Sequence, residues 1–118
     1  MTENNNTVPE ILSVRTENDK VTLELYVSEQ LSYFSGHFPG APILPGVVQL
    51  DWAVKYACEY LHMPTNVVHQ VEVLKYQMVI KPDSKIELVL EQKSASKFTF
   101  ALLSQSGTHA SGRVIVKD

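Results

Sequence analysis

A histidine and an aspartate that lie fourteen positions apart carry the clearest chemistry in this sequence. His37 supplies an imidazole and Asp51 a carboxyl group, two side chains that commonly transfer protons near neutral pH. The segment that begins at residue 36 reads GHFPGAPILPGVV and holds three of the five glycines and three of the six prolines. Glycine permits positive φ and close approach of a ligand, whereas proline removes conformational freedom. Such a loop is expected to hold its histidine in a fixed position.

A third chemical element is predicted at Gly46, where the loop enters a helix. The first N–H groups of a helix have no intrahelical acceptor and carry the positive end of the helix dipole. They can therefore polarise a carbonyl oxygen. An imidazole, a carboxyl group and preorganised N–H donors together indicate proton transfer next to a carbonyl.

The same residues also fit ordinary structural roles. Asp51, Lys55 and Glu59 stand at four-residue steps, which is typical of a solvated helix face with ion pairs. A single loop histidine such as His37 is commonly structural. The glycine and proline density around that histidine favours the functional interpretation.

One predicted helix must position the acid and the N–H donors. Apolar residues recur at three- and four-residue steps from Pro45 to Leu61, and Pro64 ends the pattern. The stripe consists of Val47, Leu50, Val54, Ala57 and Leu61. Asp51 falls at its margin, where a carboxylate is partly desolvated. Val48 and Trp52 lie on the other side, so we expect the helix to be enclosed on both sides.

The rest of the chain predicts antiparallel strands. Residues 11–15 and 21–27 form a hairpin, residues 67–80 a long strand, and residues 86–92, 97–105 and 109–117 three further strands. The alternation in the long strand changes phase after Val73, which predicts a bulge. The fold class is therefore α+β: residues 1–118 form a single domain in which an antiparallel sheet wraps around one long central helix. Its exposed sheet edges invite pairing with a second copy.

Composition excludes several classes of function. The net charge of −3, with both signs interspersed, argues against nucleic acid as a partner. A single cysteine forms no internal disulfide, and the four histidines lack metal-ligand spacing. We find neither an export signal nor about 18 consecutive apolar residues, so a cytoplasmic protein without membrane insertion is expected.

The stretch GHFPGAPILPGVVQLD resembles the signature of the hot-dog-fold β-hydroxyacyl-[acyl carrier protein] dehydratases, of the FabA and FabZ type. In these enzymes a His-Phe-x-Gly-x-Pro-x-x-Pro-Gly loop enters the central helix. The matching positions are His37, Phe38, Gly40, Pro42, Pro45 and Gly46. The resemblance implies a hot-dog fold and a cofactor-free enzyme. Its reaction would convert a β-hydroxyacyl thioester on acyl carrier protein to the trans-2-enoyl thioester, in fatty acid or polyene lipid biosynthesis.

The resemblance also implies a role for each site residue. His37 would remove the C2 proton, Asp51 would help the β-hydroxyl leave as water, and the Gly46 N–H would polarise the thioester carbonyl. The main-chain carbonyl of Ile43 would orient the imidazole. The expected substrate-binding residues are Phe38, Ile43, Pro45 and Val47. In this family the histidine and the acidic residue of one site come from different subunits. This implies a homodimer, or a heterodimer with another hot-dog protein.

Two positions depart from the common pattern. Asp51 stands where the larger branch of these dehydratases has glutamate, and Lys55 stands where glutamine is usual, so a positive charge follows the acid by one helical turn. This mixture resembles the accessory dehydratases of aryl polyene pathways, the ApeI-like members. Two alternatives remain open: a hot-dog thioesterase in which Asp51 activates water, and a non-catalytic partner subunit of a heterodimeric dehydratase.

Overall fold

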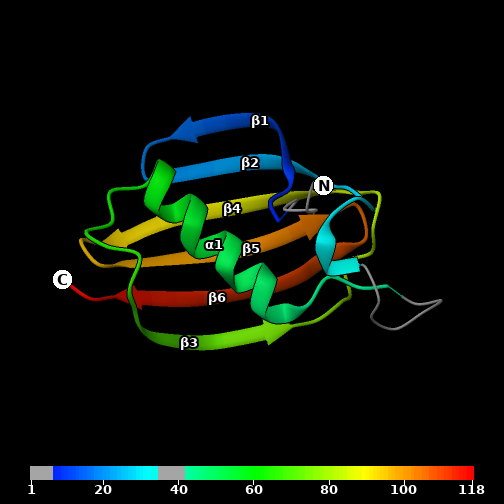
Figure 1. Ribbon diagram of the computed structural model, residues 1–118. Coiled ribbons are helices and arrows are strands. Elements are labelled where there is room, and N and C mark those ends of the chain that lie inside the picture. Colours follow the sequence, from blue (N-terminus) through cyan, green and yellow to red (C-terminus); the bar gives the residue numbers. More distant parts are fainter. Residues whose placement is uncertain (1–6, 35–41) are drawn as a thin grey trace, which may run out of the picture.

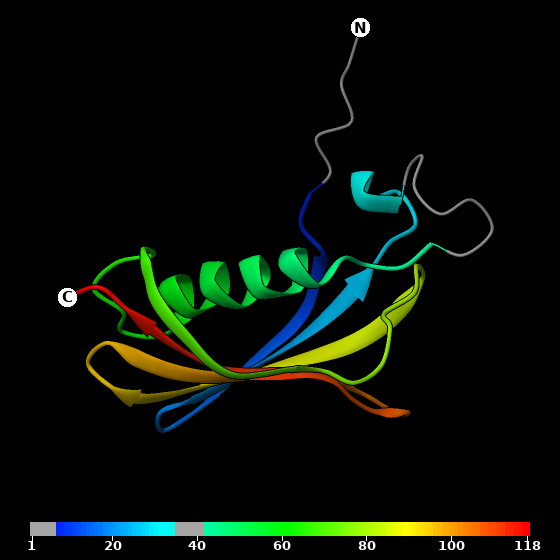
Figure 2. The same cartoon turned by 90° about the horizontal axis from the view of Figure 1, so that it is seen from below.

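The structure, a computed structural model, describes residues 7–34 and 42–118. Its one α-helix lies across the concave side of a curved antiparallel sheet (Figures 1 and 2). The sheet order is β1-β2-β4-β5-β6-β3, so β1 and β3 are the two edges. The elements are β1 Glu10–Glu17, β2 Lys20–Val27, the short 3-10 helix η1 Ser32–Phe34, α1 Gly46–Tyr60, β3 Val68–Tyr76, β4 Ser84–Ser94, β5 Lys97–Ser104 and β6 Gly107–Val116.

The core forms between α1 and the central strands, because these strands alternate apolar and polar residues with a period of two. One face of each strand is therefore buried against the helix. The buried strand residues include Val21, Leu23 and Leu25 of β2, Ile86, Leu88 and Leu90 of β4, and Phe98, Phe100 and Leu102 of β5. Burial of this apolar surface stabilises the helix in its place on the sheet.

The predicted helix is confirmed in its bounds, and of its predicted stripe Val54, Ala57 and Leu61 are buried. Its buried side contains Trp52, Ala53 and Tyr56, whereas Val47, from the predicted stripe, is 67% exposed. The large aromatic side chains bury more area than valine and so decide which side faces the sheet. The expected enclosure on both sides is wrong for the single chain, since the outer side of α1 remains exposed at Asp51.

The predicted bulge in the long strand is confirmed. The pairing of β3 with β6 shifts register between Glu72 and Lys75, and Val73 has a positive φ of 47°. The predicted extension of this strand to residue 80 is wrong, because β3 ends at Tyr76. Beyond it, the N–H groups of Gln77 and Met78 both donate to the carbonyl of His109, which takes the chain out of the regular ladder.

Candidate active site at the start of the helix

The start of α1 is fixed to the segment that follows β3. The Leu44 N–H donates to the Ile80 carbonyl at 2.8 Å, and Pro45 occupies the N-cap position with extended backbone angles. The Pro45 carbonyl accepts hydrogen bonds from the N–H groups of Val48 at 3.1 Å and Gln49 at 3.2 Å. Proline suits this position because its fixed φ is compatible with helix entry and its missing N–H is not needed there.

The Gly46 N–H lies in the first turn of α1. It has no acceptor among residues 7–34 and 42–118, as expected for a group in the first helical turn. The positive end of the helix dipole lies at the same place. Both features suit a developing negative charge on an oxygen atom.

Tyr76, from the end of β3, lies directly against this glycine. Its hydroxyl donates to the Gly46 carbonyl at 2.7 Å. A Cβ added to Gly46 would stand 2.8 Å from the Cζ atom of the ring, so only glycine permits this approach. Burial raises the pKa of the Tyr76 hydroxyl, which therefore remains a neutral donor at physiological pH.

A pocket of about 340 Å³ opens beside Gly46 and Tyr76. Its walls are Ile43, Leu44, Gly46, Gln49, Tyr76, Gln77, Met78 and Val79. Ile43 and Gly46 were predicted at the site, whereas the predicted residues Pro45 and Val47 do not line this pocket. The mostly apolar wall and the free N–H suit an acyl group that ends in a carbonyl.

Gln49 is a site residue that the sequence analysis missed. It is only 4% exposed, and its Nε2 atom donates to the Leu44 carbonyl at 3.1 Å. Its Oε1 atom is buried without a hydrogen-bond partner in the described part of the chain. The one available signal was a polar residue within the apolar run that opens the helix.

Asp51 lies on the exposed side of α1, so its expected partial desolvation is wrong for the single chain. Lys55 instead pairs with Glu59: its Nζ atom lies 2.8 Å from Glu59 Oε1 and 5.6 Å from the Tyr56 ring centroid. The ion-paired helix face is thus confirmed for Lys55 and Glu59. Contact between Asp51 and a buried substrate would require cover from outside residues 7–34 and 42–118.

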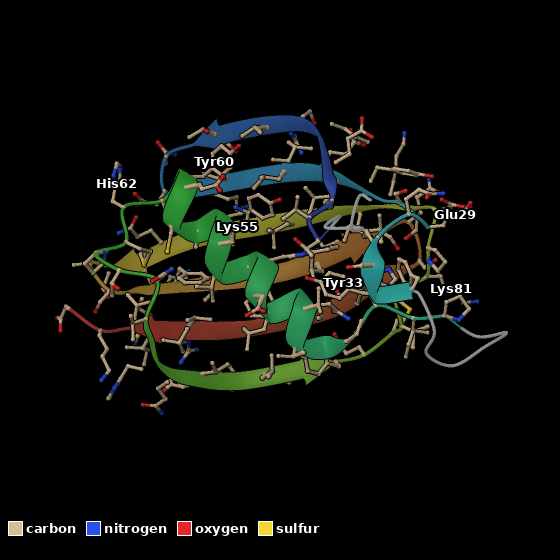
Figure 3. The ribbon with its side chains drawn as sticks, in the orientation of Figure 1. Glu29, Tyr33, Lys55, Tyr60, His62 and Lys81 are labelled. Atoms are coloured by element: carbon tan, nitrogen blue, oxygen red, sulfur yellow. The ribbon has the colours of Figure 1, made fainter. Side chains whose placement is uncertain are left out.

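The predicted base, His37, and its neighbour Phe38 lie outside the described residues. Their roles stay predictions. His62 is at the far end of α1 from Tyr33 and Lys81, and so lies away from the pocket (Figure 3). Among residues 7–34 and 42–118 there is no group of three or more histidine, cysteine or acidic residues that could hold a metal ion. None of the described helices has the length and apolar character needed to cross a membrane.

Comparison with known sequences identifies relatives of this chain. The family of ApeI-like proteins, described as ApeI dehydratase, matches residues 13–113. A thioester dehydrase, itself uncharacterized, of Halalkalibacterium halodurans is 26% identical over 98 residues, which cover 83% of this chain and 52% of the relative. The 3-hydroxyacyl-[acyl-carrier-protein] dehydratase FabZ of Chlamydia abortus is 27% identical over 117 residues, covering 92% and 71% respectively. This chain therefore spans about half the length of the first relative.

Comparison of structures agrees with the sequence matches. The dehydratase heterocomplex ApeI:P from Xenorhabdus doucetiae contains a chain that superposes with a TM-score of 0.81 at 27% identity, over 92% of this chain and 96% of that one. The expected hot-dog fold is confirmed by this likeness and by the single helix against a six-stranded sheet. Since the matched region covers most of its length, the chain belongs to the family of ApeI-like dehydratases.

Proposed function

We propose that this chain dehydrates a β-hydroxyacyl thioester carried on acyl carrier protein, and that the product is the trans-2-enoyl thioester. The observation that carries the proposal is the pocket at the start of α1, in which the Gly46 N–H, which has no acceptor in the described ranges, meets an apolar wall. The neighbouring loop contains the histidine motif of the dehydratases. Family membership supports dehydration as the reaction type.

The proposed reaction uses one base, one acid and the helix N-terminus. His37 takes the C2 proton, and the electron pair of that C–H bond moves toward the thioester carbonyl, whose oxygen accepts from the Gly46 N–H. The C2–C3 double bond then forms as the C3–O bond breaks. Asp51 gives its proton to the departing hydroxyl, so water leaves and no external oxidant or reductant is needed.

We further propose that two hot-dog chains pair along β3. This edge strand and the segments beside it expose large apolar residues: Val67, Val68, Val73, Leu74, Tyr76 and Val79. An unpaired apolar edge is a template for another strand. The similar chain of the dehydratase heterocomplex ApeI:P supports pairing because it belongs to a complex of different subunits. A partner on this side would cover the start of α1 and bring an acid to each pocket.

The carrier protein is proposed as the source of the substrate because the curated FabZ relatives are named for it. Four basic residues of this chain, Lys75, Lys81, Lys85 and Arg113, are candidates for its docking. One of them is already engaged, since Arg113 Nη1 lies 3.3 Å from Glu72 Oε1. The three lysines are therefore the better candidates.

Hydration in the reverse direction tests the proposal. Purified protein is mixed with a trans-2-enoyl thioester, and the loss of enoyl absorbance is followed. We expect turnover by the wild-type chain and none by His37→Ala. Full activity of that variant would remove His37 from the mechanism, and release of free thiol from a saturated acyl thioester would favour the thioesterase alternative instead.

A non-catalytic partner subunit is the second candidate. It is favoured by the likeness to a heterocomplex and by the absence of any described contact to Asp51. Under this interpretation the chain alone is inactive and gains stability when produced together with a second hot-dog protein. Activity of the isolated chain at catalytic concentration would exclude it.

A further inference from the structure

A buried histidine outside the predicted catalytic set holds one wall of the pocket. His109, on β6, is 8% exposed. Its Nδ1 atom lies 3.0 Å from the Val79 carbonyl oxygen, and its Nε2 atom lies 2.6 Å from Ser104 Oγ. A carbonyl can only accept, so Nδ1 carries the proton. In the neutral ring Nε2 then accepts from the Ser104 hydroxyl.

The main chain of His109 also binds Gln77 and Met78, the two residues that precede Val79 in that wall. The His109 carbonyl accepts from the Gln77 N–H at 2.8 Å and from the Met78 N–H at 3.2 Å. Three consecutive residues, Gln77 to Val79, are therefore bonded to a single residue on β6. All three line the pocket opposite the start of α1.

The other end of the imidazole is itself anchored. Ser104 lies at the end of β5, and its Oγ atom also accepts from the Ser106 N–H at 3.1 Å within the β5–β6 turn. The ring thus connects a hairpin turn to a pocket wall that has left the regular sheet. Without the Nδ1 donor, the Val79 carbonyl loses the only side-chain bond that any described residue makes to it.

We infer that His109 is a positioning residue: its Nδ1–H fixes the wall formed by Gln77, Met78 and Val79, and so determines how tightly the pocket binds an acyl thioester. The inference rests on the proposed function to the extent that an acyl group occupies this pocket. His109 is not among the residues that line the pocket, so it acts through the three wall residues.

Two amide substitutions test separately the hydrogen bonds that the two ring nitrogens of His109 make. In His109→Asn the amide nitrogen stands near the place of Nδ1 and keeps a donor for Val79, but contact with Ser104 is lost. In His109→Gln the amide reaches the place of Nε2 and keeps Ser104, but the donor to Val79 is lost. Ser104→Ala is the matched control, because it removes the hydroxyl and leaves the imidazole in place.

The readout is the affinity for octanoyl-pantetheine, a saturated thioester that cannot be dehydrated, measured by calorimetry together with KM and kcat for enoyl hydration. We expect a roughly tenfold weaker Kd and a raised KM for His109→Gln, a change within about twofold for His109→Asn and Ser104→Ala, and little change in kcat. Equal Kd values for all variants, with only the melting temperature lowered, would show a purely structural role and overturn the inference.

A measurement on the wild-type protein does not depend on how the variants fold. A long-range ¹H–¹⁵N spectrum is expected to show the Nδ1-protonated tautomer for His109, and an Nε2-protonated ring would contradict the inference. Wild-type protein that binds octanoyl-pantetheine without hydrating an enoyl thioester would end the proposed function and leave this inference intact. Failure to bind any thioester would end both.

Discussion

Gly46 combines two properties that no other residue type offers at this position. Its N–H has no acceptor within the described part of the chain, and its missing side chain lets the Tyr76 ring approach the first helical turn. The tyrosine hydroxyl in turn bonds the Gly46 carbonyl. The geometry of the helix start and of the pocket wall therefore depend on each other.

Gly46→Ala is predicted to displace the Tyr76 ring, because the new Cβ would lie 2.8 Å from its Cζ atom. We expect enoyl hydration to fall by about tenfold or more as the donor and the wall separate, which is less than the roughly 100- to 1000-fold cost of removing an oxyanion donor outright, because alanine keeps its N–H. Tyr76→Phe is the matched control, as it removes the hydroxyl bond and keeps the ring. Activity of Gly46→Ala equal to wild type would contradict the close packing described here.

Asp51 and Lys55 provide a second pair of substitutions. Asp51→Asn is predicted to lower kcat by about 100-fold or more, because the amide cannot donate an acidic proton to the leaving hydroxyl. Lys55→Gln is predicted to keep activity within about twofold, because its ammonium group pairs with Glu59 and the exposed pair contributes little. Steady-state kinetics distinguish the two outcomes, and a larger effect at Lys55 would assign the positive charge a role in the site.

The position of α1 on the sheet is stabilised by its large buried face. Tyr56 lies on that face, and its hydroxyl makes the stability of the fold depend on pH. Burial raises the pKa of Tyr56 to about 12 from its ordinary value of 10.0, with a smaller contribution from Glu59. The unfolded chain loses this proton near pH 10. Its contribution to stability is therefore intact below pH 10 and is lost as the pH rises toward 12.

Thermal melting between pH 9 and pH 12 tests this linkage. The melting temperature of the wild-type protein is expected to fall more steeply above about pH 10 than that of Tyr56→Phe, which has no hydroxyl to ionise at this position. Parallel curves for the two proteins would show that Tyr56 ionises in the folded state as readily as in the unfolded chain.

The elements were predictable where local pattern and packing agree. The helix bounds follow from Pro45 and the apolar spacing, and the bulge follows from the change of phase after Val73. The exposure of Val47 was not predictable, because periodicity places this valine on the same stripe as Val54 and Ala57, which are buried. The end of β3 was missed for another reason: a distant acceptor, the His109 carbonyl, removes Gln77 and Met78 from the ladder.

The pocket was predictable from the sequence only in part. Gly46 and Ile43, which the motif marks, line it, and their roles stay predictions. Gln49 also lines it from the first turns of α1, whereas Tyr76 and Met78 reach it through contacts between segments far apart in the sequence. Such contacts leave no local pattern in a single sequence. The exposure of Asp51 has the same origin, because its proposed surroundings belong to a second chain.

For the whole molecule, the proposed dimer accounts for an apolar edge and an exposed acid together. Leu74→Lys on β3 is predicted to yield monomers and to abolish enoyl hydration, because a charge at the paired edge opposes association. Leu12→Lys on β1 is a close control: the two leucines are 39% and 40% exposed, on opposite edges of the sheet. Light scattering gives the assembly state, and a dimeric, active Leu74→Lys protein would move the interface elsewhere.

Mixing two inactive variants tests most directly whether one site takes its base and its acid from different chains. His37→Ala and Asp51→Asn are produced together, so that about half of the dimers contain one copy of each. Every mixed dimer then holds one intact pair of His37 and Asp51, and the account predicts about a quarter of wild-type enoyl hydration. Activity no greater than that of the two variants measured separately would show that the residues do not meet across an interface, and would contradict the account.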